Sequence, residues 1–272
     1  MRAERDFLEL PASFWALIKL VSQDLGYSER GTGRLKIYTE EDVVKALERR
    51  DLSPHDVADE IRTVVAYVER RAAILYDEVR PNLMSREEAA AVFEELRSSL
   101  SPTCPLPMNK QRGAKRHHAY LTGIVNMLTE AGLGSSTAFN ADPRGPLTFT
   151  RDGRPIRTMS RRLDGAYPAI TNPLAAWEVK EYYGTTTFGS RVAGGVYETI
   201  LDGTELLELL EMEGIAVAHY LIVDDHFTWW KCGRSYLCRI IDMLHSRLVD
   251  EVLFGRETLS RWPEIVKSWP RP

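Results

Sequence analysis

The hydrophobic pattern of the first 97 residues has a helical period. Apolar residues recur three and four positions apart near the N-terminus, which predicts an amphipathic helix through Leu10, Phe14, Leu17, Ile18 and Val21. Three further helix starts follow from capping residues. Thr39 precedes three acids, Ser53-Pro54 pairs an N-cap with a first-turn proline, and Ser85 forms a capping box with Glu88. We therefore expect an all-helical N-terminal part.

A stretch without charge follows these helices. Residues 98–107 read Ser-Ser-Leu-Ser-Pro-Thr-Cys-Pro-Leu-Pro, and such a proline-rich, uncharged stretch is typical of a linker. The sequence therefore predicts two domains. Residues 1–104 would form a helical accessory or DNA-recognition domain, and residues 105–272 would form a separate core.

The period changes to that of strands from Pro146 onward. Residues 147–151 and 156–163 predict a hairpin with its turn at Asp152-Gly153, and Asp164 would end the second strand. Three elements follow: a central strand at 175–183, a long helix at 190–213 and a buried strand at 216–223. A further helix at 235–250 completes the pattern. This order predicts a mixed α/β fold in which helices flank a sheet.

Composition places the chain among globular proteins. It has 272 residues, 44% of them hydrophobic, and no apolar run long enough to span a membrane. The charged N-terminus does not resemble a secretory signal. The three cysteines, Cys104, Cys232 and Cys238, are odd in number and widely spaced, which favours a reducing compartment. We expect a cytoplasmic protein.

The formal net charge of −4 hides a basic block. Residues 108–162 carry 10 Lys and Arg against 3 Asp and Glu, whereas residues 1–97 carry 15 against 20. Such a block favours binding of a polyanion, although a solvated basic face without a partner remains the alternative.

Charged residues interrupt the predicted central strand. Side chains alternate along a strand, so Glu178 and Lys180 would share one face, and Trp177 and Val179 the other. Burying charge costs free energy unless the charge is paired or binds a metal. With Asp164 upstream, the strand completes a set of two acids and a lysine. The alternative is an ordinary ion pair on a half-exposed strand.

This set resembles the motif of the PD-(D/E)XK nuclease superfamily, which includes the type II restriction endonucleases. The resemblance covers roughly residues 110–255, although Leu163 stands where the family name has proline. It implies a restriction-endonuclease-like mixed sheet in which Asp164, Glu178 and Lys180 are catalytic. It also implies that Asp164, Glu178 and the backbone carbonyl of Val179 hold Mg²⁺, which prefers oxygen ligands.

Candidate DNA contacts lie around this motif. Basic and hydroxyl side chains suit phosphate groups, and a helix N-terminus adds free N–H groups. The candidates are Lys110, Arg112, Lys115, Arg116, Arg157, Arg162, Thr186, Ser190 and Arg191. On strand alternation, Arg162 would share a face with Asp164 and Arg161 would not. Solvated side chains, with Ser190 as a helix N-cap, are the alternative.

Together these features lead to the hypothesis of a Mg²⁺-dependent, sequence-specific endonuclease that acts on double-stranded DNA as a homodimer. Glu130 and Glu198 are the residues that could add a further acidic ligand. The sequence has no zinc-ligand spacing and no nucleotide-binding loop. The alternatives are a DNA repair or junction-resolving nuclease, and a non-catalytic DNA-binding regulator with a nuclease-like fold.

Overall fold

The computed structural model describes residues 1–111, 114–134, 138–183 and 189–270, with the side chains of 109–116 left out. Its N-terminal elements are α1 (Arg5–Leu8), α2 (Ala12–Leu25), α3 (Glu40–Glu48), η1 (Pro54–Val57), α4 (Ala58–Ala73), η2 (Ile74–Val79) and η3 (Arg80–Asn82). Next come α5 (Arg86–Leu100), β1 (Met108–Gln111), β2 (Ala114–His118), α6 (Tyr120–Leu133), β3 (Thr148–Arg151) and β4 (Arg154–Thr158). The last are β5 (Gly165–Tyr167), β6 (Ala175–Glu181), α7 (Ser190–Glu213), β7 (Ala218–Asp224), η4 (His226–Cys232), α8 (Arg234–His245), β8 (Glu251–Phe254) and α9 (Glu257–Ser268).

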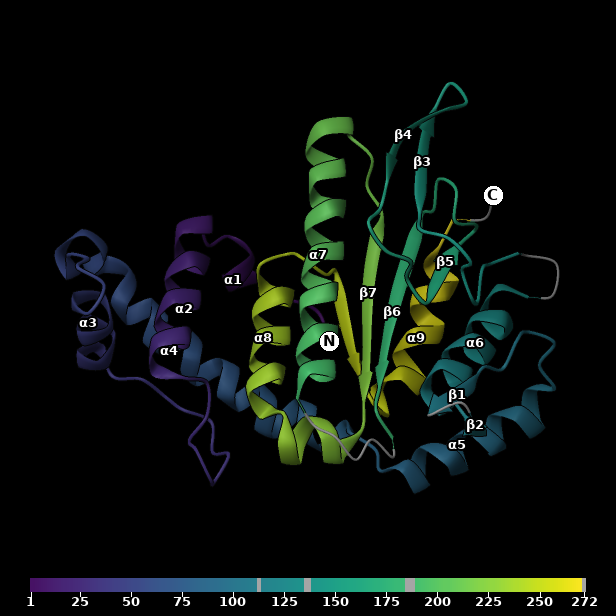
Figure 1. Cartoon of the computed structure of the whole chain (residues 1–272), viewed down its shortest axis with the longest axis horizontal. Helices are drawn as coiled ribbons and strands as arrows, with labels where there is room; N and C mark the ends of the chain where they lie inside the picture. The colour runs from purple at the N-terminus through teal and green to yellow at the C-terminus, as the bar shows by residue number, and fades with distance from the viewer. Residues whose placement is uncertain (112–113, 135–137, 184–188, 271–272) are drawn as a thin grey trace.

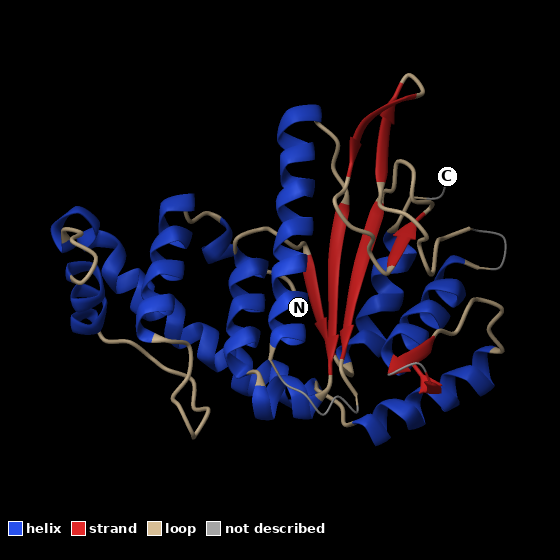
Figure 2. Cartoon of the chain, viewed as in Figure 1, coloured by secondary structure: helices blue, strands red, loops and turns tan. Residues whose placement is uncertain are grey.

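A mixed sheet of strand order β5-β6-β7-β8 forms the centre of the fold (Figure 1). Strand β5 runs antiparallel to β6, whereas β6, β7 and β8 are parallel to one another. The short hairpins β1–β2 and β3–β4 form separate two-stranded sheets (Figure 2). The predicted mixed α/β class is therefore confirmed.

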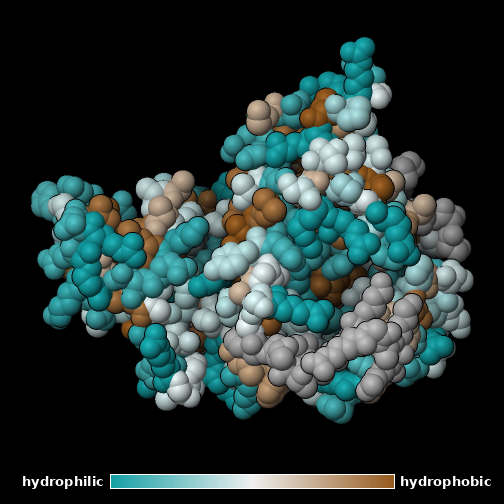
Figure 3. Space-filling view, in the orientation of Figure 1, coloured by the Kyte–Doolittle hydropathy of each residue, from teal (hydrophilic) through white to brown (hydrophobic). Residues whose placement is uncertain are grey.

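Helices cover both faces of this sheet. Helices α5, α6 and α9 share a buried core with Trp177, Val179 and Ile222 on one face. Helices α7 and α8 pack with Leu221 and Val223 on the other face. Strands covered on both faces carry apolar residues at successive positions, as β7 does. The face of the molecule shown in Figure 3 is mostly hydrophilic, with small separate apolar areas.

Helices α2, α3 and α4 enclose a core of their own. They join the sheet domain through Arg71 on α4, which is 1% exposed and lies 2.9 Å from the carboxylate of Asp242 on α8. Helix α5, which lies before the predicted boundary at 104, packs on α6 through Phe93.

Several local predictions are confirmed. Thr39 and Ser85 cap α3 and α5, each with a reciprocal capping box. Helix α7 has the predicted bounds, and the hairpin turn at Asp152-Gly153 has the positive φ angles of 51° and 75° that such turns require.

Other local predictions are wrong. Strand β4 ends at Thr158, not at residue 163, so Asp164 does not end it. Asp164 instead precedes β5. Ser53 makes no capping hydrogen bond, and Gly189, not Ser190, is the N-cap residue of α7. No helix in the described ranges has the length and apolar character to cross a membrane.

Two glycines of α7, Gly203 and Gly194, differ in how closely the rest of the protein approaches them. A Cβ added at Gly203 would lie 2.2 Å from the carbonyl oxygen of Leu248, whereas one at Gly194 would meet nothing within 4 Å. We expect Gly203→Ala to lower the free energy of unfolding by about 1–3 kcal/mol through overpacking. Gly194→Ala should raise it by up to about 1 kcal/mol through helix propensity. Urea unfolding of both variants measures the difference, and equal stabilities would contradict the close approach.

Candidate active site

Strand β6 places a carboxylate and an ammonium side by side in the interior. Glu178 is 2% exposed and Lys180 is 8% exposed, and Lys180 Nζ donates to Glu178 Oε1 over 2.5 Å. Trp177 and Val179 point into the core on the opposite face, as expected from alternation. Glu181 also faces away from this pair, because it accepts hydrogen bonds from the N–H groups of Leu121 and Thr122 at the start of α6.

Asp164 reaches the same place from the position directly before the neighbouring strand, β5. Its N–H donates to the carbonyl of Trp177, and its Oδ2 accepts from the N–H of Val179 over 2.9 Å. This close pairing depends on Gly165, where an added Cβ would lie 1.9 Å from the indole ring of Trp177. The glycine therefore lets β5 lie against β6 and brings Asp164 beside Glu178.

Arg161 is the fourth member of the site. Its guanidinium lies 2.7 Å from Glu178 Oε1 and 2.5 Å from Asp202 Oδ2. The prediction that Arg162 would share the face of Asp164 is wrong, because residues 159–163 are not a strand and do not alternate. Arg162 turns away and donates to the carbonyl of Pro143.

Helix α7 adds two acids four residues apart, Glu198 and Asp202. Glu198 Oε2 lies 3.0 Å from Lys180 Nζ, and Asp202 is fully buried beside Arg161. Residues four apart share a helix face, so both acids point toward β6. Sequence reasoning missed Asp202 and Arg161. The spacing of the two acids in α7 was the available signal for Asp202, and the strand assignment hid Arg161.

The site holds more negative than positive charge. Four carboxylates (Asp164, Glu178, Glu198 and Asp202) interact with two cations, Arg161 and Lys180, which leaves a formal charge of −2 when every acid is ionised. The two cations stabilise the ionised form of some of these carboxylates more than others. Burial raises the pKa of Glu178, but the charges of Lys180 and Arg161 outweigh burial and hold that pKa below its ordinary value.

Protons bound to Asp164 and Asp202 offset the remaining negative charge. Burial and the neighbouring Glu178 raise the pKa of Asp164 to about 7. Burial likewise raises the pKa of Asp202 to about 7, although Arg161 opposes the shift. For Lys180, the charge of Glu178 overcomes burial and raises the pKa above its ordinary value, so this side chain is an ammonium at neutral pH.

Two carboxylate oxygens of the site are buried without a hydrogen-bond partner, Glu178 Oε2 and Asp202 Oδ1. Buried polar atoms are rarely left unsatisfied, so these oxygens fit a site that takes a cation. In the described parts of the chain no group of three His, Cys, Asp or Glu side chains could hold a metal ion. Mg²⁺ is commonly bound through only one or two carboxylates, and Asp164, Glu178 and the carbonyl of Val179 are the predicted ligands that the structure brings together.

The other predicted site residues lie elsewhere. Arg157 pairs with Glu208, and Ser190 and Arg191 are exposed at the start of α7. Glu130 accepts a hydrogen bond from the N–H of Thr103 and is not part of the site. Hairpin β1–β2 carries Lys110, Lys115 and Arg116, whose side chains are not described, and Arg112 and Thr186 lie outside the described residues.

Comparison with protein families divides the chain in two. Residues 84–269 match the model described as "Domain of unknown function (DUF7687)", and residues 1–78 match the one described as "Domain of unknown function (DUF7690)". Comparisons with curated proteins and with solved structures found no match. The first match covers more than half of the chain, and its N-terminal limit falls just before α5.

The raised pKa of Asp164 predicts how stability varies with pH. The folded state keeps the Asp164 proton up to about pH 7, whereas the unfolded chain releases it near the ordinary pKa of 3.8. Holding this proton therefore stabilises the folded state fully below the pKa that Asp164 has in the unfolded chain. The stabilisation is lost as the pH rises through the pKa that Asp164 has in the folded state. We expect Asp164→Asn, which can still accept from Val179, to be more stable than the native chain at pH 8 by on the order of 2–4 kcal/mol.

Thermal unfolding of both proteins between pH 5 and pH 8 measures this effect. The difference should shrink toward the acid end, where the native aspartate is protonated. Asp77→Asn is the control. Asp77 is exposed, so this substitution should change the unfolding temperature little across the same pH range. A pH-independent difference for Asp164→Asn would show that the carboxylate is not held in its protonated form.

Proposed function

We propose that this chain, which belongs to the DUF7687 family, is a Mg²⁺-dependent endonuclease that hydrolyses phosphodiester bonds of double-stranded DNA. One observation carries the proposal. Asp164, directly before β5, meets Glu178 and Lys180 of the neighbouring strand β6 in the interior, in a cluster where acids outnumber cations. The arrangement supports a restriction-endonuclease-like fold for residues 105–272.

A purely structural ion pair does not account for this cluster. Buried ion pairs are tolerated when their geometry and hydrogen bonds are complete, but here one oxygen of Glu178 and one of Asp202 lack a partner. Asp164, Glu178 and the Val179 carbonyl would hold the cation. When bound, Mg²⁺ would polarise the scissile phosphate and lower the pKa of a coordinated water.

Lys180 has a defined part in this chemistry. Its ammonium keeps its proton at neutral pH, so it cannot act as a general base there. It can donate hydrogen bonds to the attacking water and stabilise negative charge on the phosphate. Glu178 and Glu198 hold Nζ from two sides and so fix its position.

The DNA contacts proposed here are mainly to phosphate. Hairpin β1–β2, with Lys110, Lys115 and Arg116, belongs to the basic block, and exposed Ser190 and Arg191 begin the helix that follows β6. Arg112, Arg157, Arg162 and Thr186 complete the proposed set. Cutting both strands of a duplex calls for two active sites, which favours a cytoplasmic homodimer of the restriction-enzyme type.

The direct test is incubation with unmodified plasmid and phage DNA, with Mg²⁺ or with EDTA. We expect discrete fragments with Mg²⁺, and their loss in Lys180→Ala with DNA binding retained, because the ammonium acts on the reacting phosphate. Lys231→Ala, at an exposed lysine of η4, is the control and should cut normally.

Each other outcome points to a different function. A smear in place of fragments would indicate a repair or junction-resolving nuclease that reads DNA structure. Salt-sensitive binding without cleavage would indicate a DNA-binding regulator. Unchanged cleavage by Lys180→Ala would exclude this site.

Arg161 gives a test that does not depend on cleavage. Its guanidinium and a divalent cation would compete for Glu178, so we expect Arg161→Gln to bind Mg²⁺ more tightly, on the order of tenfold. Titration calorimetry of the DNA-free protein measures this affinity. Arg162→Gln is the matched control, since Arg162 bonds to the carbonyl of Pro143 instead. Equal affinities in the two variants would rule out the competition.

A further inference from the structure

A cleft lies between α2, in the N-terminal part, and helices α7 and α8 of the sheet domain. It has a volume of about 480 Å³, within the range of small-molecule sites. One face of α2 forms the first wall, through Ala12, Trp15, Ala16, Lys19 and Gln23, with the spacing of a single helix face. Tyr197 and Ile200 of α7 form the opposite wall, and α8 lies at the base.

Arg239 of α8 lies at the base of this cleft, where aromatic rings fix its position. Its Cζ is 5.0 Å from the ring centre of Tyr27 and 5.5 Å from that of Tyr197, and both tyrosines line the cleft. Nη1 donates to the hydroxyl of Tyr197 over 2.5 Å, whereas Nε is buried without an acceptor. In the described ranges Arg239 has no carboxylate within ion-pair distance.

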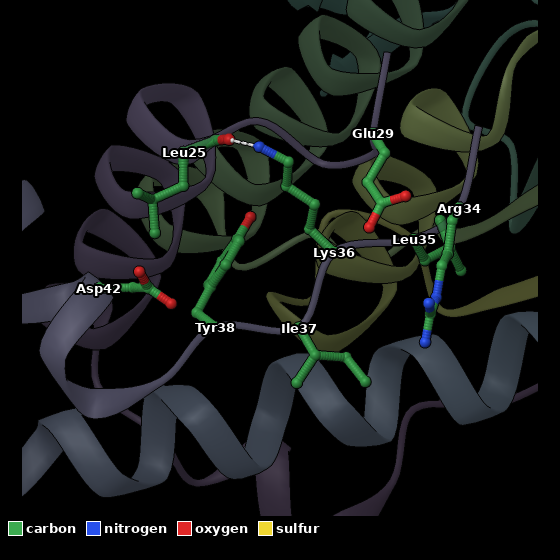
Figure 4. A pocket seen from close by; sticks show the side chains of 8 residues that line it. All are labelled: Leu25, Glu29, Arg34, Leu35, Lys36, Ile37, Tyr38 and Asp42. Atoms are coloured by element: carbon green, nitrogen blue, oxygen red, sulfur yellow. Dashed lines mark hydrogen bonds between the residues drawn. The ribbon is translucent and has the colours of Figure 1, made fainter. Parts of the chain in front are cut away.

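The other charges of the cleft leave Arg239 unopposed. Asp242 also lines it, but this carboxylate already accepts from Arg71 and from the hydroxyl of Tyr67. Lys19 is exposed at the rim and adds a second positive charge. A cavity near Lys36 differs in this respect, because Lys36 Nζ there donates to the carbonyl of Leu25 and is already engaged (Figure 4).

We propose that this cleft binds a small molecule with a flat apolar body and a single negative charge. The rings of Trp15 and Tyr197 and the side chain of Ile200 provide apolar surface for the body. A guanidinium held in place but without an ionic partner favours a carboxylate, sulfonate or phosphate ester. The walls come from both matched families, so a bound ligand would hold α2 against α7. The proposal does not rest on nuclease activity.

Two fluorescent probes of similar shape test this site. Anilinonaphthalene sulfonate carries the apolar body and the negative charge, and phenylnaphthylamine is its uncharged counterpart. We expect the full chain to bind the sulfonate at one saturable site and to bind the uncharged probe more weakly. Arg239→Gln should weaken sulfonate binding at least about tenfold, because it removes a charge-assisted hydrogen bond, and should leave the uncharged probe unaffected.

Two further variants keep the test decisive. Ala16→Trp, at an exposed position of α2, should narrow the cleft and exclude both probes even if Arg239→Gln does not fold. Arg256→Gln, where the arginine pairs with Glu88, is the control and should bind as the native chain does. Absence of binding, equal affinity for the two probes, or binding unchanged in Ala16→Trp would overturn the proposal. Loss of probe binding when the protein dimerises would also overturn the proposal, because it would show that a second copy of the chain fills the cleft.

Discussion

The burial of Glu178 is the constraint on which the rest of the sheet domain depends. A carboxylate that is 2% exposed is tolerable only beside positive charge, and Lys180 and Arg161 supply it. Those two cations in turn need the acids of α7, because each also contacts Glu198 and Arg161 contacts Asp202. The placement of α7 against β6 is therefore electrostatic as well as apolar, and Gly195 allows the close approach, because a Cβ added there would lie 3.3 Å from the side chain of Lys180.

The sequence was enough to predict the parts of this arrangement that depend on local patterns. Alternation along β6 predicted that Glu178 and Lys180 share a face, and helical period predicted α7 with its true bounds. Capping residues likewise identified the starts of α3 and α5. Each of these features is encoded within a few neighbouring residues, so one sequence suffices to predict it.

The remaining features depend on contacts between distant segments. Arg161 enters the site because residues 159–163 leave the strand conformation, and a charged segment ending in Leu163 gives no local signal of this. The pairing of β5 with β6 depends on the fit of Gly165 under the ring of Trp177, twelve positions later in the chain. The uncharged stretch at 98–107 indicated a boundary, whereas Phe93 before it packs into the core of the sheet domain.

Two buried ion pairs in this chain differ in how completely their polar atoms are paired. Arg71 meets both oxygens of Asp242 at 2.9 Å and lies against the rings of Tyr27 and Tyr67. No side-chain atom of that pair is buried without a partner in the described residues, as expected where charge serves to join two parts of a fold. Around Glu178 the pairing is incomplete, and two oxygens stay unsatisfied at a cost in stability. Incomplete pairing of this kind is what the proposed Mg²⁺ site would require, because the unpaired carboxylate oxygens are the ligand type that this cation prefers.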